Sequence, residues 1–229
     1  MEKASLVVLI SGSGSNLQAI IEAIKNNQLD AEIAAVISNQ VNAKGLNRAA
    51  RENITTHVID HRSYPSRELF DQAMMQVIDP LQPDLVVLAG FMRILSDDFI
   101  THYRHHLINI HPSLLPKYKG LNTHQKAIDN QDKLHGASVH YVDIELDSGP
   151  VVLQAEVPVL ANDNAETLAT RVLDEEHKIY PMAIQLYVEG RIRFDDDKLL
   201  FDDQPLIRPL LWKNDQLITT DEQANNDDQ

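Results

Sequence analysis

Residues 4–16 read ASLVVLISGSGSN, and this stretch decides the fold of the chain. Residues 4–10 are apolar except for Ser5 and include β-branched side chains, as is typical of a strand buried on both faces. A Gly/Ser loop follows directly, and apolar residues then recur at i, i+3, i+4 and i+7 from Leu17, which indicates a helix. A strand, a short loop and a helix in this order point backbone amides and the positive end of the helix at an anion.

The loop is a poor match to the glycine fingerprint of dinucleotide-binding proteins. The third glycine of that fingerprint would fall at Leu17. The next predicted strand, 31–37, ends in Ser38-Asn39 and lacks the acid that would hold a ribose hydroxyl. The loop therefore fits a phosphate ester better than NAD, and a plain strand-to-helix turn remains the alternative.

The alternation of apolar strands and amphipathic helices continues along the chain. Helices are predicted at 44–52 and 67–78, and strands at 55–59 and 84–90. Repeats of this length predict an α/β fold with a Rossmann-like, doubly wound, mostly parallel sheet. Two further strands, 136–142 and 151–158, are joined by a short loop, so we expect them to form an antiparallel extension of that sheet.

Three segments lie at the carboxyl ends of the predicted parallel strands, namely residues 12–16, 92–95 and 109–111. Ligands bind beyond this edge of such sheets, so we expect the three segments to share a site. Asn109 and His111 are two residues apart on one strand, and their side chains should therefore point to the same face. One offers an amide and the other an imidazole that titrates near neutral pH.

The composition narrows the classes of function. The chain has 229 residues, of which 43% are hydrophobic and 24% charged, and it has no cysteine, which excludes disulfides and cysteine nucleophiles. The net charge of −14 argues against nucleic acid as a partner. The apolar run 4–10 is too short for a signal peptide or a membrane span, so we expect a cytoplasmic protein with no membrane partner. His102, His105 and His106 lack a carboxylate at ligand spacing, and no metal site is predicted.

The C-terminal third contains a long helix and an acidic end. Asn164 is placed to cap the helix, Glu176 falls in the middle of its apolar face, and Pro181 should kink or divide it. We predict a small hairpin at 191–201 and disorder at 219–229. These features divide the chain into a domain at residues 1–190 and an acidic, partly disordered extension at 191–229.

Five segments, in this order and spacing, are highly specific. They are LISGSGSNL at 9–17, VLAGFMRIL at 87–95, NIHPSLLPK at 109–117, ELDSGP at 145–150 and EEHKIYP at 175–181. Together they resemble the phosphoribosylglycinamide formyltransferase family, the folate-dependent transformylases of purine synthesis. The resemblance covers residues 4–190 and implies the formyltransferase fold.

The resemblance implies an activity. A member of this family transfers the formyl group of 10-formyltetrahydrofolate, a co-substrate, to the amine of 5-phosphoribosylglycinamide. The products are the formylglycinamide ribonucleotide and tetrahydrofolate. The partners would be small molecules only, with the chain as a monomer or homodimer, and no metal or covalent intermediate is required.

The resemblance also implies roles for individual residues. The catalytic residues would be Asn109, His111 and Asp147. The ribonucleotide would be bound through its phosphate by Gly14, Ser15 and Asn16 and through its ribose by Glu176. The folate cleft would be lined by Arg67, Met92, Arg93, Ile94, Leu95 and Asn109, and by Asp143, Ile144, Glu145, Leu146 and Asp147. We further expect a cis Leu115–Pro116 bond. Asn122 departs from the family pattern, in which some members carry a histidine there.

Three alternatives stay open. A methionyl-tRNA formyltransferase should carry an additional basic C-terminal domain, whereas this C-terminus is acidic. A formyltetrahydrofolate hydrolase should carry an N-terminal regulatory domain, whereas the first strand here begins at Ala4. A non-catalytic nucleotide-binding protein could use the same fold, although the joint presence of Asn109, His111 and Asp147 counts against it.

Overall fold

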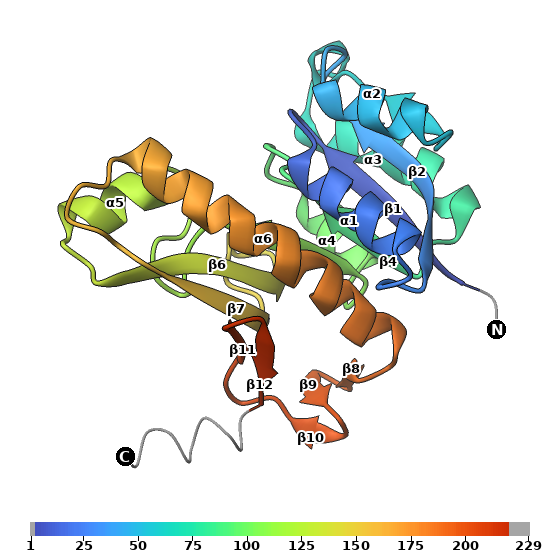
Figure 1. The fold of residues 1–229 in the computed structure, drawn as a ribbon. Coiled ribbons are helices and arrows are strands. Elements are labelled where there is room, and N and C mark those ends of the chain that lie inside the picture. Colours follow the sequence, from blue (N-terminus) through green and yellow to red (C-terminus); the bar gives the residue numbers. More distant parts are fainter. Residues whose placement is uncertain (1–2, 220–229) are drawn as a thin grey trace. The chain divides into compact units, whose positions relative to one another are not determined.

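The computed structural model describes residues 3–219, which divide into two units along the chain (Figure 1). The first unit runs to Asn109 and also includes residues 142–144. The second contains residues 110–141 and continues from Glu145.

Parallel strands form the centre of the first unit. The strands are β1 (Ala4–Ile10), β2 (Ala31–Ser38), β3 (Thr56–Val58), β4 (Leu85–Leu88) and β5 (Leu107–His111, whose last two residues belong to the second unit). Their order is β5-β4-β1-β2-β3, and each neighbouring pair is parallel, as predicted. Val8 of β1 pairs with Val36 on one side and Val87 on the other. All three are fully buried, which explains the continuous apolar runs in these strands.

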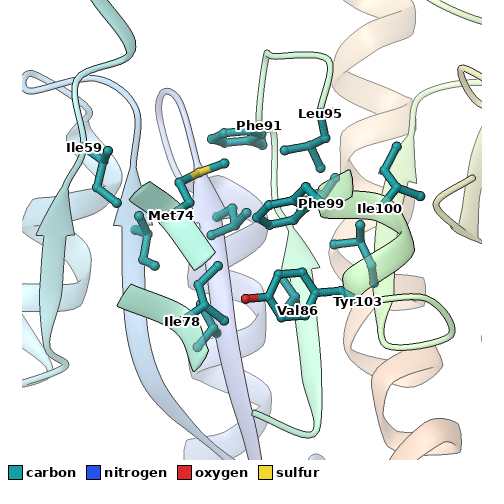
Figure 2. Packing of buried hydrophobic residues seen from close by; sticks show 14 of the residues in the cluster. Ile59, Met74, Ile78, Val86, Phe91, Leu95, Phe99, Ile100 and Tyr103 are labelled. Carbon is teal, nitrogen blue, oxygen red and sulfur yellow. The ribbon is translucent and has the colours of Figure 1, made fainter. Parts of the chain in front are cut away.

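Helices connect these strands and cover both faces of the sheet. They are α1 (Ser15–Lys25), α2 (Lys44–Arg51), α3 (Arg67–Ile78) and α4 (Asp97–His102), with short 3-10 turns η1 (His61–Ser63) and η2 (Asp79–Leu81). Figure 2 shows Met74 and Ile78 of α3 and Phe99 of α4 packed over Val86 of β4. On the opposite face, α2 approaches Ile10 so closely that a Cβ on Gly45 would lie 2.5 Å from its Cδ1. The doubly wound arrangement is therefore confirmed.

The second unit is built on antiparallel strands and one long helix. Its elements are β6 (Leu134–Tyr141), β7 (Val151–Pro158), β11 (Leu210–Lys213), β12 (Gln216–Ile218), α5 (Thr123–Asp129) and α6 (Ala165–Val188). The pair β6–β7 is antiparallel, as predicted, and β11 adds to β7 in parallel. In Figure 1, α6 runs along β6 and β7, and it contacts both. A separate small sheet contains β8 (Ile192–Asp195), β9 (Lys198–Phe201) and β10 (Gln204–Pro205), which confirms the hairpin predicted at 191–201.

Helix α6 confirms one prediction and corrects another. The side chain of Asn164 accepts hydrogen bonds from the N–H groups of Glu166 and Thr167, and a capping box is complete. The helix then runs through Pro181 to Val188 as one element, so a division at Pro181 is wrong, while the kink that was the other possibility stays a prediction. Proline removes one helical hydrogen bond, and the buried side chains of Tyr180 and Ile184 on either side keep the helix packed.

Two predictions about the C-terminal region stay predictions. Residues 191–219 form β8 to β12 within the second unit, and the division at residue 190 into a domain and an extension is not tested by this arrangement. The disorder predicted at 219–229 falls, apart from Thr219, outside the described residues. No helix between residues 3 and 219 has the length and apolar character needed to cross a membrane.

Candidate active site

The loop of residues 12–16, called the anion loop below, leads from β1 into the N-terminus of α1. Gly14 has a φ of 71°, in the left-handed region that favours glycine. A Cβ at Gly14 would lie 2.6 Å from the Cα of Gly45, so the close approach of α2 also requires glycine. The first hydrogen bond of α1 runs from the Gln18 N–H to the Gly14 carbonyl (3.0 Å), and the first turn therefore opens on the loop. Helix α1 thus begins at Ser15, directly after the left-handed Gly14.

Helix α2 holds the anion loop through hydrogen bonds to carbonyl groups of the loop. The N–H of Gly45 donates to the Gly12 carbonyl at 3.1 Å, and Nε of Arg48 donates to the Ser13 carbonyl at 2.9 Å. Nη1 of Arg48 also donates to Oε1 of Gln18 in α1. Beside the loop lies an open cavity of about 390 Å³, lined by Ser11, Gly12, Ser13, Gln40, Asn42, Ala43 and Lys44. The loop is therefore held by hydrogen bonds to the carbonyl groups of Gly12 and Ser13.

A second group of predicted residues gathers around the buried carboxylate of Asp71. Oδ2 of Asp71 accepts the N–H of Ser96 at 2.5 Å, and burial raises the pKa of Asp71. The positive charges of Arg67 and Arg93 offset part of this rise in the pKa of Asp71. The guanidinium of Arg93 also lies 5.1 Å from the ring centroid of Phe70. The structure thus brings the two arginines predicted to contact folate to one place.

The other predicted folate residues of the first unit differ in exposure. The side chains of Met92 and Ile94 are 70% and 59% exposed, whereas Leu95 is buried in the core of Figure 2. Asp143 and Ile144 are also exposed. Asn109 lies opposite Leu88 of β4 and is half-buried.

In the second unit, His111 and Asp147 lie together, as predicted. Nδ1 of His111 is 3.5 Å from Oδ2 of Asp147, and the two side chains are only 7% and 8% exposed. Nε2 of His111 lies 2.9 Å from the Tyr118 carbonyl, which can only accept, so this nitrogen carries a hydrogen. Protonation of Nδ1 then creates a buried ion pair with Asp147. The structure thus places the imidazole of His111 beside a buried carboxylate.

His140 is a second histidine near Asp147, and sequence reasoning missed it. Its Nε2 is 3.8 Å from Oδ1 of Asp147, while its Nδ1 donates to the Tyr141 carbonyl at 2.8 Å. Burial lowers the pKa of His140 to about 4, so the ring is neutral at pH 7 with its hydrogen on Nδ1. Of the two histidines, His111 has the shorter distance to a carboxylate oxygen of Asp147. Since His140 lies within an apolar strand, no local signal marks it.

The loop that carries Asp147 is tied to residues 117–120. Oδ2 of Asp147 accepts the Gly120 N–H at 2.8 Å, and Nζ of Lys119 pairs with Oε1 of Glu145 at 2.9 Å. Leu146 is 48% exposed. The Leu115–Pro116 bond that precedes this segment is cis, as predicted.

Glu176 lies on α6 with only 7% of its surface exposed, as its place on the apolar face predicted. His102, set aside as a metal ligand, pairs with Asp79 at 2.9 Å instead. Within residues 3–219, no group of three or more His, Cys, Asp or Glu residues is arranged to hold a metal ion.

Comparisons with known proteins agree with this arrangement. The chain matches a family described as "Formyl transferase" over residues 4–184. It is 50% identical to the phosphoribosylglycinamide formyltransferase of Escherichia coli (strain K12) over 202 residues, which is 88% of this chain and 95% of that protein. It is 43% identical to the protein of the same name from Haemophilus influenzae, again over 88% of this chain and 95% of that protein.

A solved structure confirms the predicted fold class. The phosphoribosylglycinamide formyltransferase of Coxiella burnetii, in complex with CHES, is 48% identical to this chain and superposes with a TM-score of 0.85. The match covers 89% of this chain and 96% of that one.

Proposed function

The chain belongs to the formyl transferase family, and on this premise we propose that it formylates 5-phosphoribosylglycinamide with 10-formyltetrahydrofolate as donor. The enzyme is a formyltransferase, and two relatives that are 50% and 43% identical to it carry the name of this reaction. The products are the formylglycinamide ribonucleotide and tetrahydrofolate. The observation that carries the proposal is the buried pair of His111 and Asp147. His111 lies two residues after Asn109 on β5.

The chemistry needs a stabilised oxyanion. The neutral glycinamide amine attacks the formyl carbon and forms a tetrahedral intermediate with a negatively charged oxygen. The amide of Asn109 donates a hydrogen bond to that oxygen, and the positive charge of a protonated His111, whose two N–H groups face the Tyr118 carbonyl and Asp147, stabilises it electrostatically. These interactions are stronger in the transition state than with the neutral formyl oxygen, so they lower the barrier.

The chemistry also needs a proton transfer. The attacking amine must lose a proton, and the departing folate nitrogen must gain one. His111, Asp147 or a water between them performs this transfer. Asp147 is oriented for this role by the Gly120 N–H, which holds one of its oxygens beside His111.

For the ribonucleotide, we assign the phosphate to Gly14, Ser15 and Asn16. The left-handed Gly14 and the first turn of α1 support this assignment because backbone amides there face outward to an anion. We assign the ribose hydroxyls to Glu176, since an ionised carboxylate accepts hydrogen bonds from them.

For the formyl donor, we assign Arg67 and Arg93 to the carboxylates of its glutamate, because guanidinium groups form bidentate hydrogen bonds with carboxylates. The exposed side chains of Met92 and Ile94 offer apolar surface for the ring system. The donor's proposed contacts are completed by Leu95, by Asn109 and by the loop of Asp143, Ile144, Glu145, Leu146 and Asp147.

An assay of tetrahydrofolate release tests the proposal. Absorbance is followed with 10-formyltetrahydrofolate in the presence and in the absence of the glycinamide ribonucleotide. A transferase releases tetrahydrofolate only when the ribonucleotide is present. Release without it would indicate a hydrolase, and no release in either case would indicate a non-catalytic binding protein. The cytoplasmic location and the monomeric or homodimeric state stay predictions.

A further inference from the structure

One serine hydroxyl links three loops at the carboxyl ends of β1, β2 and β4. The N–H of Met92 donates to Oγ of Ser11 at 2.8 Å, and the Ser11 hydroxyl donates to Oδ1 of Asn39 at 2.7 Å. Ser11 follows β1, Asn39 follows β2, and Met92 lies four residues beyond β4. All three residues belong to the first unit. Nothing in the assigned chemistry uses Ser11 or Asn39.

The direction of each hydrogen bond is fixed by the groups involved. A backbone N–H can only donate, so Ser11 must accept from Met92, and its single hydrogen is left for Asn39. Asn39 is 2% exposed, and its backbone carbonyl accepts Nδ1–H of His61 at 3.0 Å. The side chain of Asn39 is held by burial, and its Oδ1 accepts the Ser11 hydrogen, so the lone pairs of the Ser11 oxygen face Met92.

The segment that Ser11 holds carries the donor-side residues. The chain leaves β4 through Gly90, whose φ of 72° turns it away from the strand. The segment 92–95 is then anchored at its start by Ser11 and just past its end by the bond from the Ser96 N–H to Asp71. Between these anchors, the side chains of Met92 and Ile94 stand exposed. Loss of the first anchor frees the backbone from which both side chains project.

We propose that Ser11 is a positioning residue for the formyl donor, which acts by fixing the Met92 backbone rather than by touching the donor. This inference rests on the proposed function, in which segment 92–95 contacts the donor. It predicts a selective effect, because the anion loop is held by other bonds, from Gly45 to Gly12 and from Arg48 to Ser13. The Ser11 hydroxyl therefore serves the donor although Ser11 adjoins the ribonucleotide's loop.

The test is steady-state kinetics with both substrates varied, for wild type, Ser11→Ala, Ser11→Cys and Ser11→Thr. Loss of the hydrogen bond that fixes the Met92 N–H should raise KM for 10-formyltetrahydrofolate about threefold to tenfold in Ser11→Ala. KM for the ribonucleotide and kcat should not change, as expected when only ground-state binding is lost. Ser11→Thr keeps the hydroxyl and should restore the wild-type value. Ser63→Ala is the matched control, since Ser63 is exposed and lies outside the site.

Ser11→Cys keeps the shape of serine with a much weaker hydrogen-bonding group, so it serves if Ser11→Ala folds poorly by circular dichroism. It should raise the donor KM in the same way. A donor KM that is unchanged in the folded variants, or that rises together with the ribonucleotide KM, overturns the inference.

A binding measurement separates this inference from the proposed function. Calorimetric titration with tetrahydrofolate requires no turnover, and Ser11→Ala should weaken the affinity by the same factor as the donor KM. Equal affinities in wild type and variant overturn the inference, whatever the assay shows. A wild type that releases no tetrahydrofolate with the ribonucleotide overturns the proposed function instead.

Discussion

His111 and Asp147 are held in place by backbone groups of residues 118–120, not by other catalytic side chains. The Tyr118 carbonyl accepts from His111, and the Gly120 N–H donates to Asp147. Asp147 itself has a φ of 48°, which few residues other than glycine, asparagine and aspartate adopt. The geometry of the pair is thus set by the fold of two loops in the second unit, and mutations of the side chains should test the chemistry with little change in the loops.

The first prediction concerns the pair as a unit. His111→Ala should lower kcat by about 10²–10⁴, the usual range for general acid–base groups. Asp147→Asn removes the charge while nearly keeping the shape, and it should also lower kcat. If the two residues act together, the double variant should be little worse than the worse single variant. Turnover of all four proteins, with folding checked for each, measures this. Losses that multiply independently, or an Asp147→Asn enzyme as fast as wild type, would show that Asp147 is only a loop acid.

At the scale of elements, the anion loop depends on the packing of α2 against α1. A Cβ at Gly14 would lie 2.6 Å from the Cα of Gly45, so Gly14 does not tolerate a side chain without movement of the backbone. The carbonyl groups of the loop are bound by Gly45 and Arg48 of α2. A substitution at Gly14 therefore displaces the first turn of α1 and the amides that face the proposed phosphate.

The second prediction follows from this contact. Gly14→Ala should raise KM for the ribonucleotide on the order of 10-fold to 100-fold, because small displacements of binding groups have effects of that size. KM for the folate should change far less. Gly190→Ala is the matched control, since Gly190 has a φ of 70° but open space around its Cα. It should cost about 1–2 kcal/mol of stability from the left-handed backbone and leave both KM values unchanged. Equal increases in both KM values for Gly14→Ala would show that the loop does not bind the ribonucleotide and has a structural role only.

The elements also show how far the sequence predicts this fold. The bounds of β1, α3 and β7 agree with the predicted 4–10, 67–78 and 151–158, because continuous apolar runs and a 3.6-residue period are local signals. Which loops meet is not a local property. Ser11 bonds to Asn39 and Met92, which are 28 and 81 residues away, and no pattern in the sequence indicates either contact. For the same reason no sequence pattern indicates the ion pair between Lys119 and Glu145. At Pro181 the packing of the helix prevents the division that the proline alone would allow.

At the scale of the whole molecule, buried histidines make stability depend on pH. Burial lowers the pKa of His135 to about 4, with a further contribution from His124, whose Nδ1 lies 3.1 Å from its Nε2. Burial also lowers the pKa of His140 to about 4. The unfolded chain binds a proton at each of these residues near pH 6.5. Between pH 6.5 and 4 the unfolded state therefore holds more protons than the folded state, and stability falls as pH falls.

The third prediction states how steeply stability depends on pH. As pH falls from 6.5 to 4, His135 and His140 should each multiply the unfolding equilibrium constant by about ten per pH unit. This corresponds to a loss of about 1.4 kcal/mol of stability per pH unit for each histidine. Urea denaturation between pH 7.5 and 4 measures the slope. His135→Gln should reduce it by the share of one histidine, whereas His106→Gln, at an exposed position, should not. A flat profile between pH 6.5 and 4 would contradict burial of the two rings in neutral form.

The central claim is that the formyl group moves from the folate to the ribonucleotide amine, and a labelled donor tests it most directly. With 10-formyltetrahydrofolate carrying ¹³C in its formyl carbon, the ¹³C spectrum reports where the label goes. The account predicts one product signal, that of the formamide on the glycinamide ribonucleotide, in an amount equal to the tetrahydrofolate released. His111→Ala should produce it more slowly by the factor seen in kcat. Label that appears as formate, or that stays on the folate when the ribonucleotide is present, would contradict the account.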